Sequence, residues 1–241
     1  MKGRLQWTWI GVAAAVGLTA AALGAGEQIK IIDIDAWGPG CSGGPFEVQP
    51  ISFGFTPGGT GQHGAAANNF LTFCVETNEY LSEGKTYDVV FNTDAVNGGS
   101  GGGNQDPLDA MTACLYTAFI KGTLDDKLLT NGHTFTYGSE PDGKDLQQAI
   151  WVIENEGGLT YASLSTLGKG IYDLAKADVA TGGEWYNKWG ANSIGHVRVM
   201  NLSQNGNDNQ DLLVLIPLPA PACLGLVGLI GVGVLRRRLF H

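Results

Sequence analysis

A cysteine and a glutamine are the residues of this sequence whose types suit an uncommon reaction, the formation of an internal thioester. Cys74 lies in a strand-like stretch, and Gln147 lies in a stretch with the apolar period of a helix. A thiolate can attack the carboxamide carbon of a glutamine and expel ammonia. Because an amide is a poor acyl donor and a thioester hydrolyses in water, the two side chains need a dry, preorganised site. If they meet in the core, the sequence predicts a Cys74–Gln147 cross-link that an incoming amine or hydroxyl can open.

Apolar neighbours of the types that exclude water surround both residues in the sequence. Gln147 and Trp151 are four residues apart, so they share one edge of a helix beside its apolar stripe. The pocket that we expect around the thioester is formed by Phe73, Val75, Ile150 and Trp151.

The two stretches resemble the paired motifs of the Cys-Gln thioester domains of bacterial surface adhesins. In that family an aromatic residue or Leu precedes the Cys and an apolar residue follows it, as in Phe73-Cys74-Val75. The second motif, apolar-Gln-x-x-apolar-Trp, is matched by residues 146–151, and the resemblance extends from about 71 to 216. It implies a protein that captures a nucleophile covalently and once, and not a turnover enzyme. Its partner would be an amine- or hydroxyl-bearing surface or matrix molecule, in adhesion or matrix attachment.

The cysteine count bears on the alternative that Cys74 belongs to a disulfide with Cys41 or Cys114. Of the four cysteines, Cys223 lies in the C-terminal apolar segment, which leaves three in the exported domain. In an oxidising compartment disulfides account for two of these at most. The odd count favours a Cys41–Cys114 disulfide, with Cys74 left for Gln147. In the other interpretation, Gln147 is an ordinary exposed helix residue.

Two further classes of function remain as alternatives. One is a non-covalent envelope or matrix binding protein, for which Trp185, Tyr186 and Trp189 could form a platform that stacks on carbohydrate. The other is a Cys-dependent enzyme, but no motif orients a histidine on Cys74. Because the histidines are scattered without the ligand spacing of zinc sites, we expect no metal and no cofactor.

The pattern along the chain predicts an α+β fold, a β-sandwich or barrel with an inserted helical subdomain of about three helices. Strands are expected at 28–35, 46–55, 70–80, 85–92, 193–202 and 211–216. Helices are expected from Asp106-Pro107 to Gly122, over 143–156, and from Ser163 or Ser165 to Ala177.

Both ends of the chain are typical of targeting segments. Residues 1–25 combine Lys2 and Arg4, an apolar stretch and small residues at the end, the order of a secretory signal peptide. The domain would then span residues 26–216. The net charge of -9 disfavours nucleic acid as a partner, because an acidic surface repels phosphates.

Residues 217–241 resemble a PEP-CTERM sorting signal of bacterial surface proteins. Pro217-Leu218-Pro219 precedes an apolar run, and Arg236, Arg237 and Arg238 follow it. The resemblance implies processing by a sorting protease of the exosortase type. The apolar run is near the lower limit for a membrane span, and the arginines would stay on the cytoplasmic side. We therefore expect an exported protein of the cell envelope or outer surface that is membrane-anchored at least transiently; a plain tail anchor is the alternative.

Overall fold

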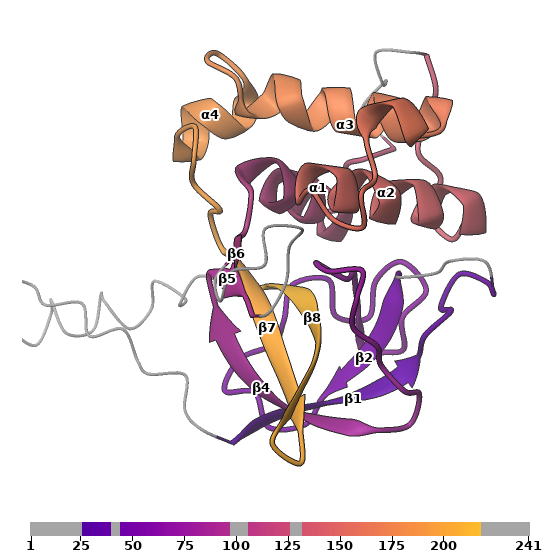
Figure 1. Ribbon diagram of the computed structural model, residues 1–241, viewed down its shortest axis with the longest axis vertical. Helices are drawn as coiled ribbons and strands as arrows, with labels where there is room; N and C mark the ends of the chain where they lie inside the picture. Colours follow the sequence, from indigo (N-terminus) through magenta and orange to yellow (C-terminus); the bar gives the residue numbers. More distant parts are fainter. Residues whose placement is uncertain (1–25, 40–43, 97–105, 126–131, 218–241) are drawn as a thin grey trace, which may run out of the picture.

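The computed structural model describes residues 26–39, 44–96, 106–125 and 132–217 (Figure 1). Within them the fold is α+β, as predicted, with a curled half-barrel sheet on one side and the helices on the other. The strands are β1 (Glu27–Asp33), β2 (Phe46–Pro50), β3 (Phe70–Thr72), β4 (Thr86–Asn92), β5 (Asp94–Ala95), β6 (Asp106–Pro107), β7 (Val197–Gln204) and β8 (Asn207–Leu215). The helices are α1 (Ala110–Ile120), α2 (Glu140–Ile153), the 3-10 turn η1 (Tyr161–Ser163), α3 (Thr166–Val179) and α4 (Glu184–Trp189).

The main sheet is antiparallel throughout, with the order β3-β2-β1-β4-β7-β8. Its strands follow the alternation expected of a sheet with one buried face. In β1, for example, Ile29 and Ile31 are fully buried, while Lys30 between them and Gln28 before them are half-buried. The helices are inserted between β6 and β7, as the sequence pattern predicts.

The two edges of the sheet meet through the residues that follow β3. The N–H of Val75 donates to Asp211 O at 3.0 Å, and the N–H of Leu213 donates to Phe73 O at 3.2 Å. The hydroxyl of Thr72 also donates to Leu213 O at 2.6 Å. These bonds hold the 73–75 segment against β8, so the sheet curls back on itself around an apolar interior.

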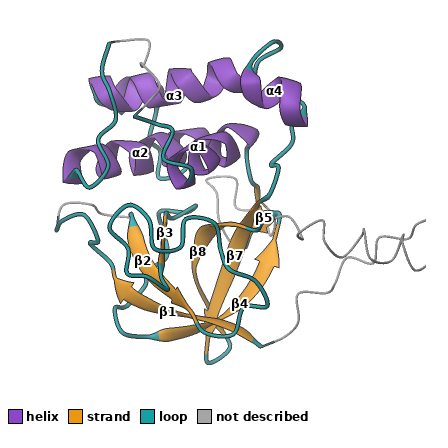
Figure 2. Cartoon of the chain, turned by 180° about the vertical axis from the view of Figure 1, so that it is seen from behind, coloured by secondary structure: helices purple, strands orange, loops and turns teal. Residues whose placement is uncertain are grey.

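The helices stack in two layers over one end of the curled sheet, α1 and α2 next to it and α3 and α4 outside them (Figures 1 and 2). Capping side chains define two of the helix starts. The carboxylate of Asp109 accepts from the N–H of Met111 at 2.6 Å, and the hydroxyl of Ser165 accepts from the N–H of Gly168 at 2.9 Å. In α2 a proline in the first turn and two acidic residues near it suit the positive end of the helix dipole.

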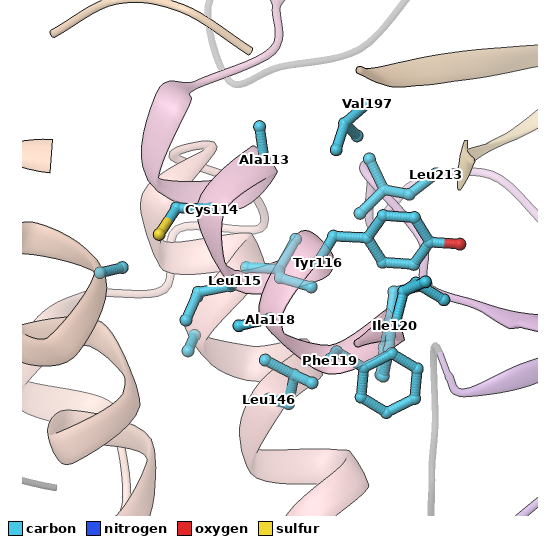
Figure 3. Packing of buried hydrophobic residues seen from close by; sticks show 14 of the residues in the cluster. Ala113, Cys114, Leu115, Tyr116, Ala118, Phe119, Ile120, Leu146, Val197 and Leu213 are labelled. Atoms are coloured by element: carbon cyan, nitrogen blue, oxygen red, sulfur yellow. The ribbon is translucent and has the colours of Figure 1, made fainter. Parts of the chain in front are cut away.

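The apolar core has two parts. One lies inside the curl of the sheet and contains Cys74 and Leu212; the other lies between sheet and helices and contains Phe73 and Val75. This division follows from the alternation of side chains along an extended segment. Figure 3 shows the second part around α1, where Tyr116 points toward Leu213 and the sheet and Cys114 points the opposite way.

Several predicted boundaries are wrong, each for a local reason. Helix α1 begins at Ala110, because Asp109 caps it and Asp106–Pro107 instead form β6, paired with β5. The strand predicted over 70–80 has strand pairing only through Cys74, since the chain leaves the sheet after Val75. The short helix α4 was not predicted, and β8 begins at Asn207 instead of residue 211.

Candidate functional site

The residues of the glutamine motif lie on two different faces of helix α2. Leu146 and Ile150 are fully buried in the core between sheet and helices. Gln147 is also fully buried, although its side chain is polar, and Trp151 packs against the core inside the curl. The interpretation of Gln147 as an exposed helix residue is therefore wrong. A buried carboxamide must be hydrogen-bonded, so its partners define the site.

The partners of the Gln147 carboxamide are the main-chain groups of Cys74 itself. The N–H of Cys74 donates to Gln147 Oε1 at 2.9 Å, and Gln147 Nε2 donates to Cys74 O at 2.9 Å. In the bridge between Cys74 and Leu212 the hydrogen bonds run through the flanking residues, so both main-chain groups of Cys74 point away from β8. The Gln147 carboxamide hydrogen-bonds to the N–H and the C=O of Cys74, as the main chain of a neighbouring strand would. Its carbonyl carbon, bonded to both Oε1 and Nε2, is thereby held against Cys74.

Trp151 continues this contact one helical turn further along α2. Its Nε1 donates to Glu76 O at 3.1 Å, and Gln210 Nε2 donates to the same oxygen at 2.6 Å. Gln147 and Trp151, four positions apart on α2, thus hydrogen-bond to Cys74 and Glu76, two positions apart on the extended segment. The shared helix edge predicted for Gln147 and Trp151 exists, and its two side chains fix the register between the helix and the segment.

The backbone at Gly44 covers the other side of the carboxamide. A Cβ at this position would lie 2.8 Å from Gln147 Oε1 and 2.9 Å from Phe73 Cδ1. The φ of Gly44 is +137°, a conformation that residues with side chains rarely adopt. Only glycine fits here, because the chain passes directly over the amide.

Burial governs the chemistry of the Cys74 thiol. Only 2% of Cys74 is exposed. Burial, and secondarily the charges of Glu76 and Glu79, raise the pKa of the thiol well above its ordinary value. Cys74 is therefore a thiol at neutral pH, unlike the exposed, low-pKa cysteines of thiol enzymes. Among the described residues it forms no disulfide.

Of the two cysteines of the predicted disulfide, only Cys114 lies in the described residues. Cys114 is buried in α1, and its thiol donates to Asp178 Oδ2 at 3.8 Å. Cys41 lies outside the described residues, so the Cys41–Cys114 pairing stays a prediction. The signal peptide at 1–25, Pro219 and the three arginines also lie outside them, whereas Pro217 is the last described residue. In the described ranges no helix has the length and apolarity to cross a membrane.

One part of the site was missed from the sequence, a group of three buried carboxyls and one half-buried carboxyl near Cys74. We name Glu76, Glu79, Glu156 and Asp211 the acidic cluster. Burial, and then the charge of Asp211, raise the pKa of Glu76 to about 10. Burial raises the pKa of Asp211 to about 7. A charged residue two positions after a cysteine, at the end of an apolar strand pattern, is the signal that could have indicated it.

The four residues predicted to form the pocket differ in burial. Phe73, Val75 and Ile150 are each at most 1% exposed, and Trp151 is half-buried. No three His, Cys, Asp or Glu side chains within the described ranges form a group that could hold a metal ion. Compared with known proteins, the chain matches no protein-family model, no curated protein and no solved structure.

Proposed function

We propose that this chain is an exported surface protein whose Cys74 and Gln147 join in an internal thioester that captures a nucleophile on a partner. The observation that carries the proposal is the fully buried Gln147 carboxamide, held at 2.9 Å by both main-chain groups of Cys74. The carboxamide pairs two buried main-chain groups that an apolar side chain would leave without partners. A carboxamide fixed against a buried cysteine is the arrangement that thioester formation requires.

The hydrogen bonds of the pair suit the bond-forming step. Attack of the Cys74 sulfur on the carboxamide carbon moves negative charge onto Gln147 Oε1. That oxygen already accepts from the N–H of Cys74, so a main-chain donor is in place where charge develops. The nitrogen that leaves as ammonia is held by Cys74 O.

Burial supports the lifetime of the product. With Gln147 fully buried and Cys74 2% exposed, water has little access to the acyl carbon. A partner's amine would attack that carbon, form an amide with the side chain at position 147, and release the Cys74 thiol. Each molecule would react once, so the protein would bind one partner covalently and would not act as a turnover enzyme. The expected partner is an amine- or hydroxyl-bearing molecule of a surface or matrix.

The capture chemistry is tested with methylamine, a small primary amine. Wild-type domain incubated with methylamine is expected to gain one adduct on residue 147 and one alkylatable thiol at Cys74. Gln147→Ala should gain neither, while Gln148→Ala, changed at the half-buried neighbour, should react as wild type does. An adduct elsewhere, or one that persists in Cys74→Ala, would contradict the proposal.

The biological role needs a separate comparison. Wild type and Cys74→Ala are exposed to whole cells or extracellular matrix and then boiled in denaturant. Retention of wild type alone is the expected result. If both proteins wash away equally, covalent capture is not the function, even if the bond forms.

A groove at the far end of α1 favours one second candidate, non-covalent binding of an acidic carbohydrate. Two adjoining cavities of about 290 and 250 Å³ share a lining of Thr117, Lys121, Trp185, Lys188 and Trp189. Lys188 Nζ lies 5.1 Å from the centroid of the Trp189 ring. Aromatic faces beside ammonium groups suit a sugar that carries a carboxylate, and its carboxylate would lie in the second cavity, because Asp178 and Glu184 line the first. Binding of polygalacturonate that weakens in Trp189→Ala, persists in Cys74→Ala and is lost in denaturant would support this function instead.

The proposal for localisation rests on the two ends of the sequence. The secretory pattern of residues 1–25 and the proline, apolar and arginine pattern of residues 217–241 favour export and transient anchoring. Processing by an exosortase-type protease would remove Cys223 and the arginines. Mass spectrometry of the surface form tests this, and an intact C-terminal peptide there would indicate a simple anchor.

A further inference from the structure

Gln210 of β8 is a second buried glutamine beside the candidate site, and the proposed reaction does not use it. Only 3% of Gln210 is exposed. Its Nε2 donates to Glu76 O at 2.6 Å, a bond between residues 134 positions apart. A buried carboxamide costs free energy unless it is hydrogen-bonded. The bond to Glu76 O is therefore the contact that makes a glutamine tolerable at this position.

An irregularity in β8 determines where the Gln210 side chain points. In the pairing of the two strands, β7 advances by two residues where β8 advances by three, from Leu212 to Asn209. Strand β8 thus has one extra residue in this interval, a β-bulge, and Gln210 and Asp211 lie in it. Both are buried, whereas consecutive side chains of a regular strand point to opposite faces. Because a bulge changes the direction of side chains, it allows Gln210 to reach the extended segment beside β8.

The Glu76 carbonyl is the point at which β8 and α2 hold the same residue. It accepts from Gln210 Nε2 at 2.6 Å and from Trp151 Nε1 at 3.1 Å. A carbonyl oxygen has two lone pairs, so one donor from each element satisfies it. One residue earlier, the main-chain N–H of Val75 donates to Asp211 O at 3.0 Å. Gln210 therefore extends the attachment of the segment to β8 one residue beyond that bond.

The position of Glu76 affects the position of Cys74 relative to α2. Gln147 bonds to Cys74 and Trp151 bonds to Glu76, so one helix edge holds both ends of the 74–76 stretch. Without Gln210, Glu76 O would be held by α2 alone, and this end of the stretch would lose its side-chain bond to β8. Reacting atoms must lie about 3–3.5 Å apart, and a misplacement of about 1 Å can slow a reaction roughly 100-fold. A residue that fixes the stretch can thus affect the rate without contacting the reacting atoms.

We propose that Gln210 is a positioning residue for formation of the Cys74–Gln147 thioester. It holds the end of the extended segment against β8, so that the Cys74 sulfur stays within reach of the carboxamide carbon that α2 presents. In the reaction the sulfur–carbon bond forms, the carbon–nitrogen bond breaks, and the thiol proton leaves with the nitrogen as ammonia. Gln210 takes part in none of these bond changes. This inference rests on the proposed function and adds to it a residue outside both sequence motifs.

The test follows ammonia loss by intact mass in freshly synthesised full-length protein, made by cell-free synthesis with detergent. Gln210→Met keeps the length of the side chain but removes the donor, so ammonia loss should be about tenfold slower than in wild type. Gln204→Met is the matched control, because Gln204 Nε2 donates to Thr86 O at 2.9 Å, a bond of the same kind between β7 and β4. It should lose comparable stability in urea and keep the wild-type rate.

Gln210→Glu gives a readout that a merely structural role would not change. A protonated carboxyl at position 210 can donate to Glu76 O as the carboxamide does, whereas a carboxylate can only accept. Gln210→Glu should therefore lose ammonia at nearly the wild-type rate near pH 5 and fall behind wild type as the carboxyl ionises. Gln210→Met should be slower than wild type by the same factor at every pH. Equal slowing of both variants at every pH would mean that Gln210 only packs, and would overturn the proposal.

The remaining outcomes are also decisive. A wild-type rate in Gln210→Met would overturn the positioning role and leave the thioester intact, as would equal slowing in Gln204→Met. A wild type that never loses ammonia would overturn the proposed function together with this inference. Should Gln210→Met fail to fold by circular dichroism, Gln210→Asn decides. Its carboxamide is withdrawn by one methylene, so slower ammonia loss is expected and a wild-type rate would contradict the positioning role.

Discussion

At the scale of single residues, Gln147 is a hydrogen-bond partner of Cys74, and we propose that it is also the cross-linking partner. Before ammonia is lost, its carboxamide satisfies both the N–H and the C=O of Cys74. A thioester would keep Oε1, the acceptor, but not Nε2, the donor to Cys74 O. Cys74 contributes to the same contact through its main chain, which any residue at this position retains. The two members of the pair therefore differ in what their removal leaves behind.

This difference predicts unequal effects on stability. Gln147→Ala leaves two buried main-chain groups unpaired, so the free energy of unfolding should fall by about 3 kcal/mol. Cys74→Ala removes one buried sulfur and keeps both hydrogen bonds, so the loss should be about 1 kcal/mol. Urea denaturation of the two variants measures both values. Since neither can form the cross-link, equal losses would mean that the hydrogen bonds contribute nothing.

The approach of Gly44 to the carboxamide gives a second prediction. Gly44→Ala should destabilise the domain by about 3 kcal/mol and slow ammonia loss, because the new Cβ strains the backbone and displaces Gln147 Oε1. Gly182→Ala is the control, since Gly182 also has a positive φ, +92°, but open space around it. It should cost about 1 kcal/mol and leave ammonia loss unchanged. Full, rapid ammonia loss in Gly44→Ala would show that the contact does not position the amide.

At the scale of elements, the proposed thioester depends on one edge of α2 that is held in register with the extended segment 74–76. The sequence predicted this helix edge, because the apolar period of α2 fixes which residues face inward. It also predicted the water-excluding neighbours Phe73 and Trp151. It could not predict that Gln147 would bond to the main chain of Cys74, since that contact joins residues 73 positions apart and depends on how the sheet closes.

The register of helix and segment is tested by Trp151→Phe. Phenylalanine keeps an aromatic ring but cannot donate to Glu76 O, so the domain should lose about 1 kcal/mol of stability. The thioester should also hydrolyse faster, as followed by the gain of free thiol at neutral pH.

Trp37→Phe is a matched control, because Trp37 Nε1 likewise donates one hydrogen bond of 3.1 Å, to His63 O. It should lose similar stability without changing the half-life of the thioester. Equal half-lives for the two variants would show that Trp151 is ordinary core.

At the scale of the whole molecule, buried carboxyls determine how we expect the stability of the fold to depend on pH. The general acidity of the chain was evident from its composition, but the burial of Glu76 and Asp211 was not. Composition cannot distinguish a solvated carboxylate from a neutral one in the core. Strand and helix order gave the fold class, whereas the acidic cluster arises only when β8, the 73–76 segment and the end of α2 come together.

The raised pKa values determine how stability depends on pH. In the folded state the pKa is about 10 for Glu76, about 8 for Glu154 and about 7 for Asp211, and burial is the main cause of each. Between pH 5 and pH 10 the folded state therefore binds more protons than the unfolded state. The stability that these groups contribute is complete below the ordinary carboxyl pKa values and is lost as the pH rises through the folded values.

We accordingly expect the free energy of unfolding to fall by on the order of 3 kcal/mol between pH 5 and pH 9. Urea denaturation in the Cys74→Ala background measures this without interference from thioester hydrolysis. Adding Glu76→Gln should flatten the profile, because that side chain does not titrate. A free energy of unfolding that rises from pH 5 to pH 9 would contradict the raised pKa values of Glu76, Glu154 and Asp211.

The most direct test of the central claim, a covalent bond between Cys74 and Gln147, is the intact mass of the folded domain purified at neutral pH. We predict that wild type is lighter than its sequence by one ammonia, that Cys74 resists alkylation, and that Cys74→Ala and Gln147→Ala each restore the full mass. A wild-type mass equal to that of the sequence, with Cys74 alkylated after unfolding, would contradict the claim.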